Sequence, residues 1–144
     1  PAEGRDIAHL EKTVGISLPK DFLAALKLGN GQNGNIPGIF DGHRFLCIDE
    51  ILSDWNVLKM LSEEGDFDDE RSRPESGIKK RWWNPHWIPF TNNGFGDHFC
   101  LDMDPSSEGA LGQVIFVWHD APGRSLVSND FSAWLSKLST SKGK

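Results

Sequence analysis

The sequence predicts an α+β fold, with helices near the N-terminus, a curved and mostly antiparallel β-sheet, and a C-terminal helix that closes the domain. Apolar residues near both ends of the chain recur at helical spacing. Residues 87–104 alternate with a period of two on either side of an Asn-Gly turn, which is typical of a β-hairpin. The length of 144 residues suits one domain, so we expect residues 1–144 to form a single domain.

The first 29 residues predict two amphipathic helices. The first helix should end at Gly15, and its apolar residues follow the i, i+3, i+7 pattern: Ile7, Leu10 and Val14. Pro19 suits the first position of the second helix, and Gly29 can supply a left-handed C-cap. The buried stripe of this helix would be Phe22, Leu23 and Leu26. Residues 29–38, GNGQNGNIPG, are too rich in glycine for regular structure and predict a loop.

Residues 39–58 predict a hairpin followed by a third helix. Asp41-Gly42 is a dipeptide favoured in two-residue hairpin turns, here between residues 39–40 and 43–48. Asp49 can cap the helix that follows. The buried side of this helix would be Ile51, Leu52, Trp55 and Leu58.

The strand that returns from Asn93-Gly94 has the clearest alternation in the chain. One face would hold Phe99, Leu101 and Met103, and the other His98, Cys100, Asp102 and Asp104. The apolar run 114–118 predicts a central strand covered on both faces, and a short strand is expected at 126–127. The last helix, capped by Ser128 or Asn129, would bury Phe131, Trp134, Leu135 and Leu138. Residues 139–144 should fray.

The net charge of −6 is concentrated in one acidic segment, about residues 63–77, which we expect to be a variable loop. Its carboxylates are opposed locally only by Arg71 and Arg73: Glu63, Glu64, Asp66, Asp68, Asp69, Glu70 and Glu75. Negative charge repels phosphate backbones, so we expect no direct nucleic-acid binding, whereas a basic protein partner would be attracted. A solvated loop without a partner is the alternative explanation.

Other features predict a cytoplasmic protein without a cofactor. No apolar run approaches the roughly 20 residues that span a bilayer, and the first residues lack the basic and apolar regions of a secretory leader. Pro1 is not an initiator Met, so the native N-terminus is undefined. Cys47 and Cys100 lie in apolar sequence without metal-ligand spacing, which predicts buried free thiols.

Several short motifs follow one another along most of the chain. They are Leu18-Pro19 before a helix ending in Asn30-Gly31, Trp87-Ile88-Pro89, Gly96-Asp97, Cys100-Leu101-Asp102, Asp104-Pro105, Gly112-Gln113-Val114, and a terminal helix with Phe131 and Trp134-Leu135. In this order they resemble the SUKH superfamily, which includes bacterial immunity proteins and yeast cell-wall assembly regulators. The resemblance implies an α+β fold without catalytic activity. The motif residues with structural roles would be Leu18, Pro19, Gly31, Pro89, Gly96, Asp97, Gly112 and Gln113.

The resemblance to bacterial members implies an immunity protein that covers a cognate toxin, with a basic nuclease favoured because acidic side chains can mimic phosphates. The alternative is a regulatory scaffold that binds a peptide or adaptor, as in the cell-wall regulators. Both hypotheses require a binding surface. The candidate partner-binding residues are Asn30, Gln32, Asn33, Glu64, Asp66, Asp68, Asp69, Trp83, Trp87, Asp102 and Asp104.

A metal-dependent hydrolase is the enzyme alternative, since carboxylates and imidazoles are ligands for Mg, Mn or Zn. Its candidate ligands are Asp97, His98, Asp102, Asp104, His119 and Asp120. Only His98, Asp102 and Asp104 would share a face of their strand, and Asp is also common where turns begin. We therefore predict no metal site.

Overall fold

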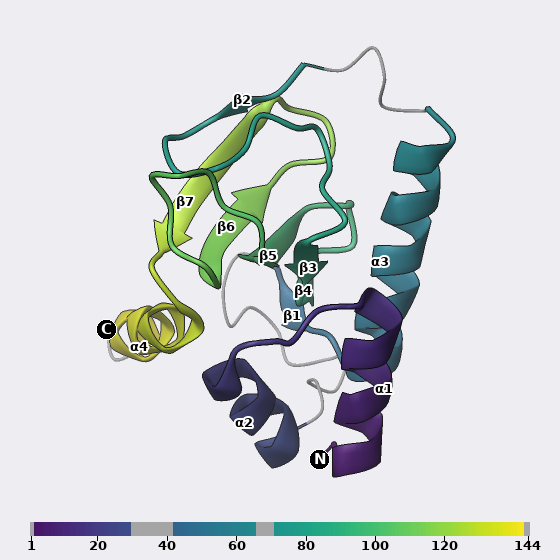
Figure 1. The fold of residues 1–144 in the computed structure, drawn as a ribbon. Coiled ribbons are helices and arrows are strands. Elements are labelled where there is room, and N and C mark those ends of the chain that lie inside the picture. Colours follow the sequence, from purple (N-terminus) through teal and green to yellow (C-terminus); the bar gives the residue numbers. More distant parts are fainter. Residues whose placement is uncertain (1, 30–41, 66–70, 143–144) are drawn as a thin grey trace.

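The computed structural model describes residues 2–29, 42–65 and 71–142. Helices and strands alternate along these residues and form the predicted α+β fold (Figure 1). The helices are α1 (Gly4–Val14), α2 (Lys20–Leu28), α3 (Ile48–Glu63) and α4 (Phe131–Lys142). The strands are β1 (Arg44–Phe45), β2 (Arg73–Pro74), β3 (Trp87–Pro89), β4 (Thr91–Asn92), β5 (His98–Asp102), β6 (Gln113–Val117) and β7 (Gly123–Ser128).

Five strands form the main sheet in the order β2-β7-β6-β5-β3. The pairs β3–β5, β5–β6 and β6–β7 are antiparallel, and β2 lies parallel to β7 at the opposite edge from β3. β1 and β4 make a separate antiparallel pair, in which Arg44 lies opposite Asn92. The turn at Asn93-Gly94 therefore leads into β5, as predicted.

The helices surround the sheet on two sides (Figure 1). α3 runs along one side of the sheet with α1 next to it, while α2 and α4 lie below the sheet in this view. The carboxylate of Asp21 in α2 accepts hydrogen bonds from the backbone N–H and the hydroxyl of Ser132 in α4, at 3.0 and 2.8 Å. This contact joins the second helix of the chain to the last one, although α2 ends at Leu28 and α4 begins only at Phe131.

Buried apolar side chains form two clusters, and neighbouring positions of β5 belong to different ones. Leu101 packs in the larger cluster with residues of all four helices, whereas Cys100 packs in the smaller one. The smaller cluster contains Ile78, Trp83, Trp87, Cys100, Ile115 and Val117, with Leu58 of α3 against it. The predicted alternation along β5 is therefore confirmed, and both faces are covered.

Three helix ends differ from their predicted caps. Gly15 ends α1 in the left-handed region as expected, with φ of 75°, but Gly29 is extended, with φ of −158°. α3 begins at Ile48, one residue before Asp49, and Glu50 accepts a hydrogen bond from the backbone N–H of Cys47 at 3.1 Å. The α3 end differs from the prediction by one residue and is satisfied by this local contact, a difference within the usual spread of helix boundaries.

The cap of α4 is Asp130, and neither Ser128 nor Asn129 has that role. Oδ1 of Asp130 accepts a hydrogen bond from the backbone N–H of Ala133 at 2.7 Å. The hydroxyl of Ser128 donates instead to the carbonyl of Asp130 at 2.9 Å. The helix continues to Lys142, into the segment that was expected to fray.

Part of the predicted acidic loop has regular structure. α3 extends to Glu63, and Arg73–Pro74 form β2 beside β7. The backbone N–H of Glu75 donates to the carbonyl of Arg124 at 2.8 Å. The β2 segment therefore supplies hydrogen-bond partners to the backbone of β7. The predicted hairpin partner of β1, residues 39–40, lies outside the described residues.

Asp130→Ala should destabilise the protein by about 1 kcal/mol, because the first turn of α4 loses its side-chain acceptor. Asn129→Ala is the matched control, since Asn129 is exposed next to the cap and should change the free energy of unfolding by less than about 0.5 kcal/mol. Urea denaturation measures both. Equal losses in the two variants would contradict the assignment of Asp130 as the cap.

Candidate functional site

A groove of about 390 Å³ lies between α3 and one end of the main sheet, and we call it the α3 groove. α3 contributes one wall through an aspartate and three aliphatic side chains, and the segments around β3 to β7 contribute the other. The lining residues are Asp54, Val57, Leu58, Leu61, Trp82, Trp83, Asn92, Gly96, His98, Val117, Trp118, His119 and Arg124.

Arg124 organises the sheet side of the α3 groove. It is opposite Val117 in the register of β6 and β7, and its residue is only 1% exposed. Its Nε and Nη2 donate to the carbonyl of Trp82 at 3.1 and 2.7 Å, and its Nη1 donates to the carbonyls of Trp118 and Ala121 at 3.2 and 2.8 Å. The guanidinium also lies 4.4 Å from the centroid of the Trp82 ring. One side chain thus holds both tryptophan-bearing segments at the groove.

The rim of the α3 groove carries an ion pair between Asp97 and His119. Oδ1 of Asp97 accepts hydrogen bonds from the backbone N–H of His119 at 2.9 Å and from its Nδ1 at 2.8 Å. The hydrogen bond to Asp97 raises the pKa of His119. Burial alone would raise the pKa of Asp97, but hydrogen bonds from His119 and Asn93 outweigh it and lower that pKa. Asp120 adds an exposed carboxylate 3.9 Å from Nδ1 of His119.

Asp54 and His98 also line the groove, and each makes a hydrogen bond to the strand region around β4. Oδ2 of Asp54 accepts a hydrogen bond from Nδ2 of Asn92 at 2.9 Å. Nδ1 of His98 lies 2.8 Å from the carbonyl of Thr91, and because a carbonyl only accepts, this nitrogen carries the proton. Burial lowers the pKa of His98, so its ring is neutral at pH 7.

The five predicted partner-binding residues that the structure describes do not converge on one surface. Glu64 is exposed at the end of α3 and Asp104 is half-buried, but Trp83, Trp87 and Asp102 are 3%, 0% and 0% exposed. The two indoles pack edge to face at 5.6 Å within the smaller cluster, so they form part of the interior. Six further candidates lie outside the described residues: Asn30, Gln32, Asn33, Asp66, Asp68 and Asp69.

Asp102 belongs to a buried polar network. Its Oδ2 accepts a hydrogen bond from Nε2 of Gln113 at 2.8 Å, and its Oδ1 accepts one from the backbone N–H of Asp104 at 2.9 Å. The same Nε2 donates to the carbonyl of Gly77 at 2.9 Å. Burial raises the pKa of Asp102 despite the hydrogen bond from Gln113. This network joins the loop before β3 to β5 and β6.

Asp104 points away from Asp102 to a different set of partners. Lys79 donates to its Oδ1 at 2.6 Å, and Asn84 donates to its Oδ2 at 3.0 Å. Burial would raise the pKa of Asp104, but Lys79 and Asn84 lower it. His98, Asp102 and Asp104 are therefore committed to separate contacts and do not form the ligand set of a hydrolase.

Among the described residues, Asp97, His119 and Asp120 form one cluster in which three ligand atoms lie within 4.8 Å of one another. The sequence analysis included all three among its candidate ligands. Here Nδ1 of His119 and Oδ1 of Asp97 are already paired, and His119 and Asp120 are exposed. An ordinary surface ion pair accounts for this arrangement.

The motif residues of the family resemblance support turns and packing contacts. Gly112 has φ of 83°, and a Cβ there would lie 3.2 Å from Cγ of Pro19. Gly96 has φ of 93°, and a Cβ there would lie 3.1 Å from Cβ of His119. Leu18 is buried and its N–H donates to Glu11 at 2.7 Å, while Pro89 ends β3. Gly31 lies outside the described residues.

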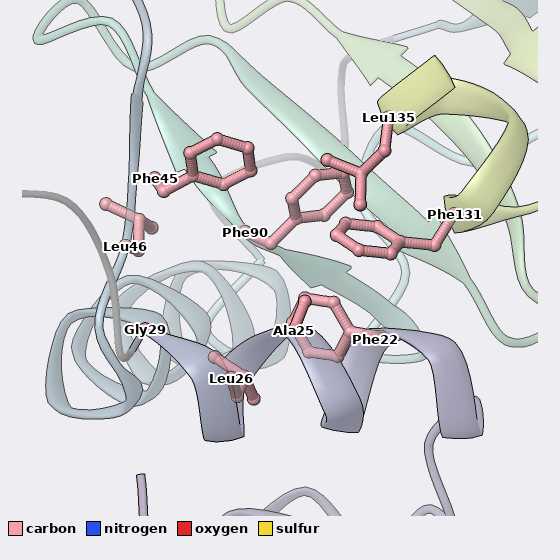
Figure 2. A pocket seen from close by; sticks show the side chains of 9 residues that line it. All are labelled: Phe22, Ala25, Leu26, Gly29, Phe45, Leu46, Phe90, Phe131 and Leu135. Carbon is pink, nitrogen blue, oxygen red and sulfur yellow. The ribbon is translucent and has the colours of Figure 1, made fainter. Parts of the chain in front are cut away.

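A second cavity, of about 210 Å³, has a uniformly apolar lining (Figure 2). Aromatic rings from α2, the β1 segment, Phe90 and α4 face one another in this view. Phe22 and Phe131 pack edge to face at 5.1 Å, as expected inside a core. The lining consists of Phe22, Ala25, Leu26, Gly29, Phe45, Leu46, Phe90, Phe131 and Leu135. These described lining residues offer no side-chain hydrogen-bonding group.

Together, these features define an α+β domain with a groove whose walls combine aromatic, aliphatic and acidic side chains. The chain belongs to the SMI1 / KNR4 family (SUKH-1), whose family model matches residues 1–137. The predicted resemblance to the SUKH superfamily is therefore confirmed.

Named relatives of this chain are fungal regulators. It is 22% identical over 169 residues to a glucan synthesis regulatory protein of Neurospora crassa, covering 92% of this chain and 32% of the relative. It is 25% identical over 145 residues to the cell wall biosynthesis/cell cycle regulator smi1 of Schizosaccharomyces pombe, covering 91% of this chain and 29% of the relative. The chain thus spans about a third of the length of these relatives. Along its described residues, no helix is both long and apolar enough to cross a membrane.

Sequence reasoning missed Asp54 and Arg124 as groove residues. Asp54 has the spacing of an ordinary exposed helix position, and Arg124 follows a Pro-Gly turn that predicts only a loop. Trp118 belongs to the apolar run 114–118 that was expected to be covered on both faces. The pairing of β6 with β7 places Trp118 near Arg124, whereas Asp54 and Trp82 reach the groove from α3 and from the segment before β3. No local pattern encodes this arrangement.

Asp97→Asn should lower the pKa of His119 toward its ordinary value, because the negative hydrogen-bond acceptor is lost. NMR titration of the His119 ring proton measures this, with His119→Gln assigning the signal. Asp120→Asn is the control and should have a smaller effect, since its carboxylate is 3.9 Å away and exposed. An unchanged pKa in Asp97→Asn would contradict the assignment.

The same pair gives a defined pH window for stability. The contribution of His119 is complete below pH 6.5 and is lost as the pH rises through its raised pKa. The contribution of Asp97 is complete above pH 3.8 and is lost as the pH falls through its lowered pKa. Between these limits, the stability difference between wild type and Asp97→Asn should be largest.

Asp102→Asn should destabilise the protein by about 1–3 kcal/mol. Both carboxylate oxygens of Asp102 accept hydrogen bonds, so the NH2 group of the new amide would face an N–H donor of Gln113 or of the Asp104 backbone. Asp104→Asn should cost less than about 1 kcal/mol, since Asp104 is only half-buried. Urea denaturation at pH 7 compares the two variants. A loss in Asp104→Asn as large as in Asp102→Asn would show that the buried network does not dominate.

Proposed function

We propose that this chain is a non-catalytic regulatory domain that binds a partner protein by receiving a segment of it in the α3 groove. The names of the fungal relatives support a regulatory function. The groove supports binding, because its volume of about 390 Å³ falls within the range of ligand sites and its walls combine apolar and polar groups. We also propose that the chain acts as one domain in the cytoplasm.

The chemistry of the α3 groove favours binding over catalysis. Among the described residues, its lining contains no Ser, Thr, Cys or Lys that could serve as a nucleophile. The ring of His98 donates to the carbonyl of Thr91, and His119 is paired with Asp97, so both imidazoles already have structural hydrogen bonds. A groove with two tryptophans at its walls is instead suited to apolar and cationic side chains of a protein.

The regulatory function is preferred to toxin immunity for two reasons. The curated relatives are named as regulators of glucan synthesis and of the cell wall, and none of these names refers to a toxin. The phosphate-mimicry hypothesis also depended on Asp66, Asp68 and Asp69, which lie outside the described residues, and on Asp102, which is buried. No feature of the described surface is specific to a nuclease partner.

A chimera tests the proposed function. This chain would replace the matching segment of the Schizosaccharomyces pombe regulator in a strain that lacks that regulator, and growth under cell-wall stress would be scored. The chimera should restore growth, and Val57→Arg should abolish the rescue because it fills the groove with a charged side chain. Circular dichroism would verify that the variant folds.

Met60→Arg is the matched control. Met60 lies on the same helix and is 55% exposed, against 53% for Val57, but it does not line the groove. Rescue by Met60→Arg and not by Val57→Arg supports the proposal. Rescue by both variants would exclude the groove as the functional surface, and failure of the unaltered chimera would count against a shared regulatory function.

A further inference from the structure

We propose that the segment received in the α3 groove is an extended peptide of a partner protein that carries a Lys or Arg next to an aliphatic residue. This inference rests on the proposed function and specifies the chemistry of the partner. It depends on the charges around the groove, on the apolar wall of α3, and on the positions of Trp82 and Trp118.

Three carboxylates face or border the groove. Asp54 lines it from α3, with its side chain 28% exposed and oriented by the hydrogen bond from Asn92. Asp97 and Asp120 flank His119, and the side chain of Asp120 is 70% exposed. A cation entering here would meet negative charge from α3 on one side and from the β5 and β6 ends on the other.

The positive charges at the groove do not cancel these carboxylates. Arg124 is 1% exposed, and its N–H groups are directed at backbone carbonyls and not toward solvent. His119 carries at most one charge, which is paired with Asp97. Asp54 and Asp120 therefore remain as accessible negative groups, in a chain whose net charge is −6.

The apolar part of the groove suits the remainder of such a segment. Val57 and Leu61 lie one helical turn apart on α3, and both line the groove with Leu58 between them. Trp82 and Trp118, both half-buried, line the opposite side. The methylene stem of a Lys or Arg can pack on such a surface while its charged end reaches the carboxylates, and a neighbouring aliphatic side chain fills the space beside α3.

Selection from a displayed library of random octapeptides tests the inference. The full chain is the bait, and Val57→Arg is used in parallel to identify peptides that need the groove. Groove-dependent peptides should be enriched in Lys or Arg adjacent to Leu, Ile, Val or Pro. Enrichment without a preference for positive charge, or no groove-dependent peptide at all, would overturn the inference.

A selected peptide then allows a quantitative comparison by isothermal titration and NMR. Asp54→Asn and Asp120→Asn should each weaken binding about two- to fivefold, as expected for partly exposed ion pairs. Asp49→Asn is the control, because it removes the same charge from the exposed start of α3 and does not line the groove. The indole N–H signals of Trp82 and Trp118 should shift on binding.

The outcomes separate this inference from the proposed function. Equal weakening by Asp49→Asn would indicate a general charge effect and overturn the inference. Shifts of the same indole signals on concentrating the protein alone would indicate that a second copy occupies the groove, which also overturns it. Either result leaves the chimera test of the groove intact, whereas rescue by Val57→Arg in that test would remove the proposed function itself.

Discussion

The guanidinium of Arg124 lies at the end of the sheet, where several chain segments with little regular structure meet. A buried cation is unfavourable unless its donors are satisfied, and here the carbonyls of Trp82, Trp118 and Ala121 accept them. Each of these carbonyls also lacks a strand partner in the ladders of the main sheet. Arg124 thus donates hydrogen bonds to loop carbonyls that have no partner within the sheet. By holding these loops in place, it also sets the positions of Trp82 and Trp118 in the wall of the α3 groove. A lysine could not replace this fork of donors.

The two faces of the sheet have different roles. The larger cluster joins the sheet to all four helices and contains most of the buried apolar side chains. The smaller cluster, built around Trp83 and Trp87, is covered mainly by the C-terminal half of α3 through Leu58. Where this cover ends, the α3 groove begins. A helix that only partly covers one sheet face thereby provides a stable wall beside an open site.

Local patterns predicted the elements whose signals are periodic. The stripes of α1 and of α4, the alternation of β5, and the turn at Asn93-Gly94 all appear where expected. The parallel pairing of β2 with β7 did not, because Arg73 and Pro74 lie in a charged stretch with no strand-like signal. Trp83 and Trp87 were candidate partner-binding residues, and only the tertiary fold places both inside the smaller cluster. The groove depends on contacts between residues far apart in the chain, such as the hydrogen bonds of Arg124 to the carbonyl of Trp82, and these are beyond local rules.

The outer strands of the main sheet bear on how the molecule avoids association with its own copies. β2 and β3 are the edges of the sheet, with two and three residues, and each ends in a proline. Proline has no N–H to donate, and so short a strand presents few free backbone groups to an incoming strand. Sheet extension by another chain is thereby disfavoured at both edges. A protein that bound this domain as we propose would therefore contact side-chain surfaces, and its recognition would depend on the identity of side chains more than on backbone pairing.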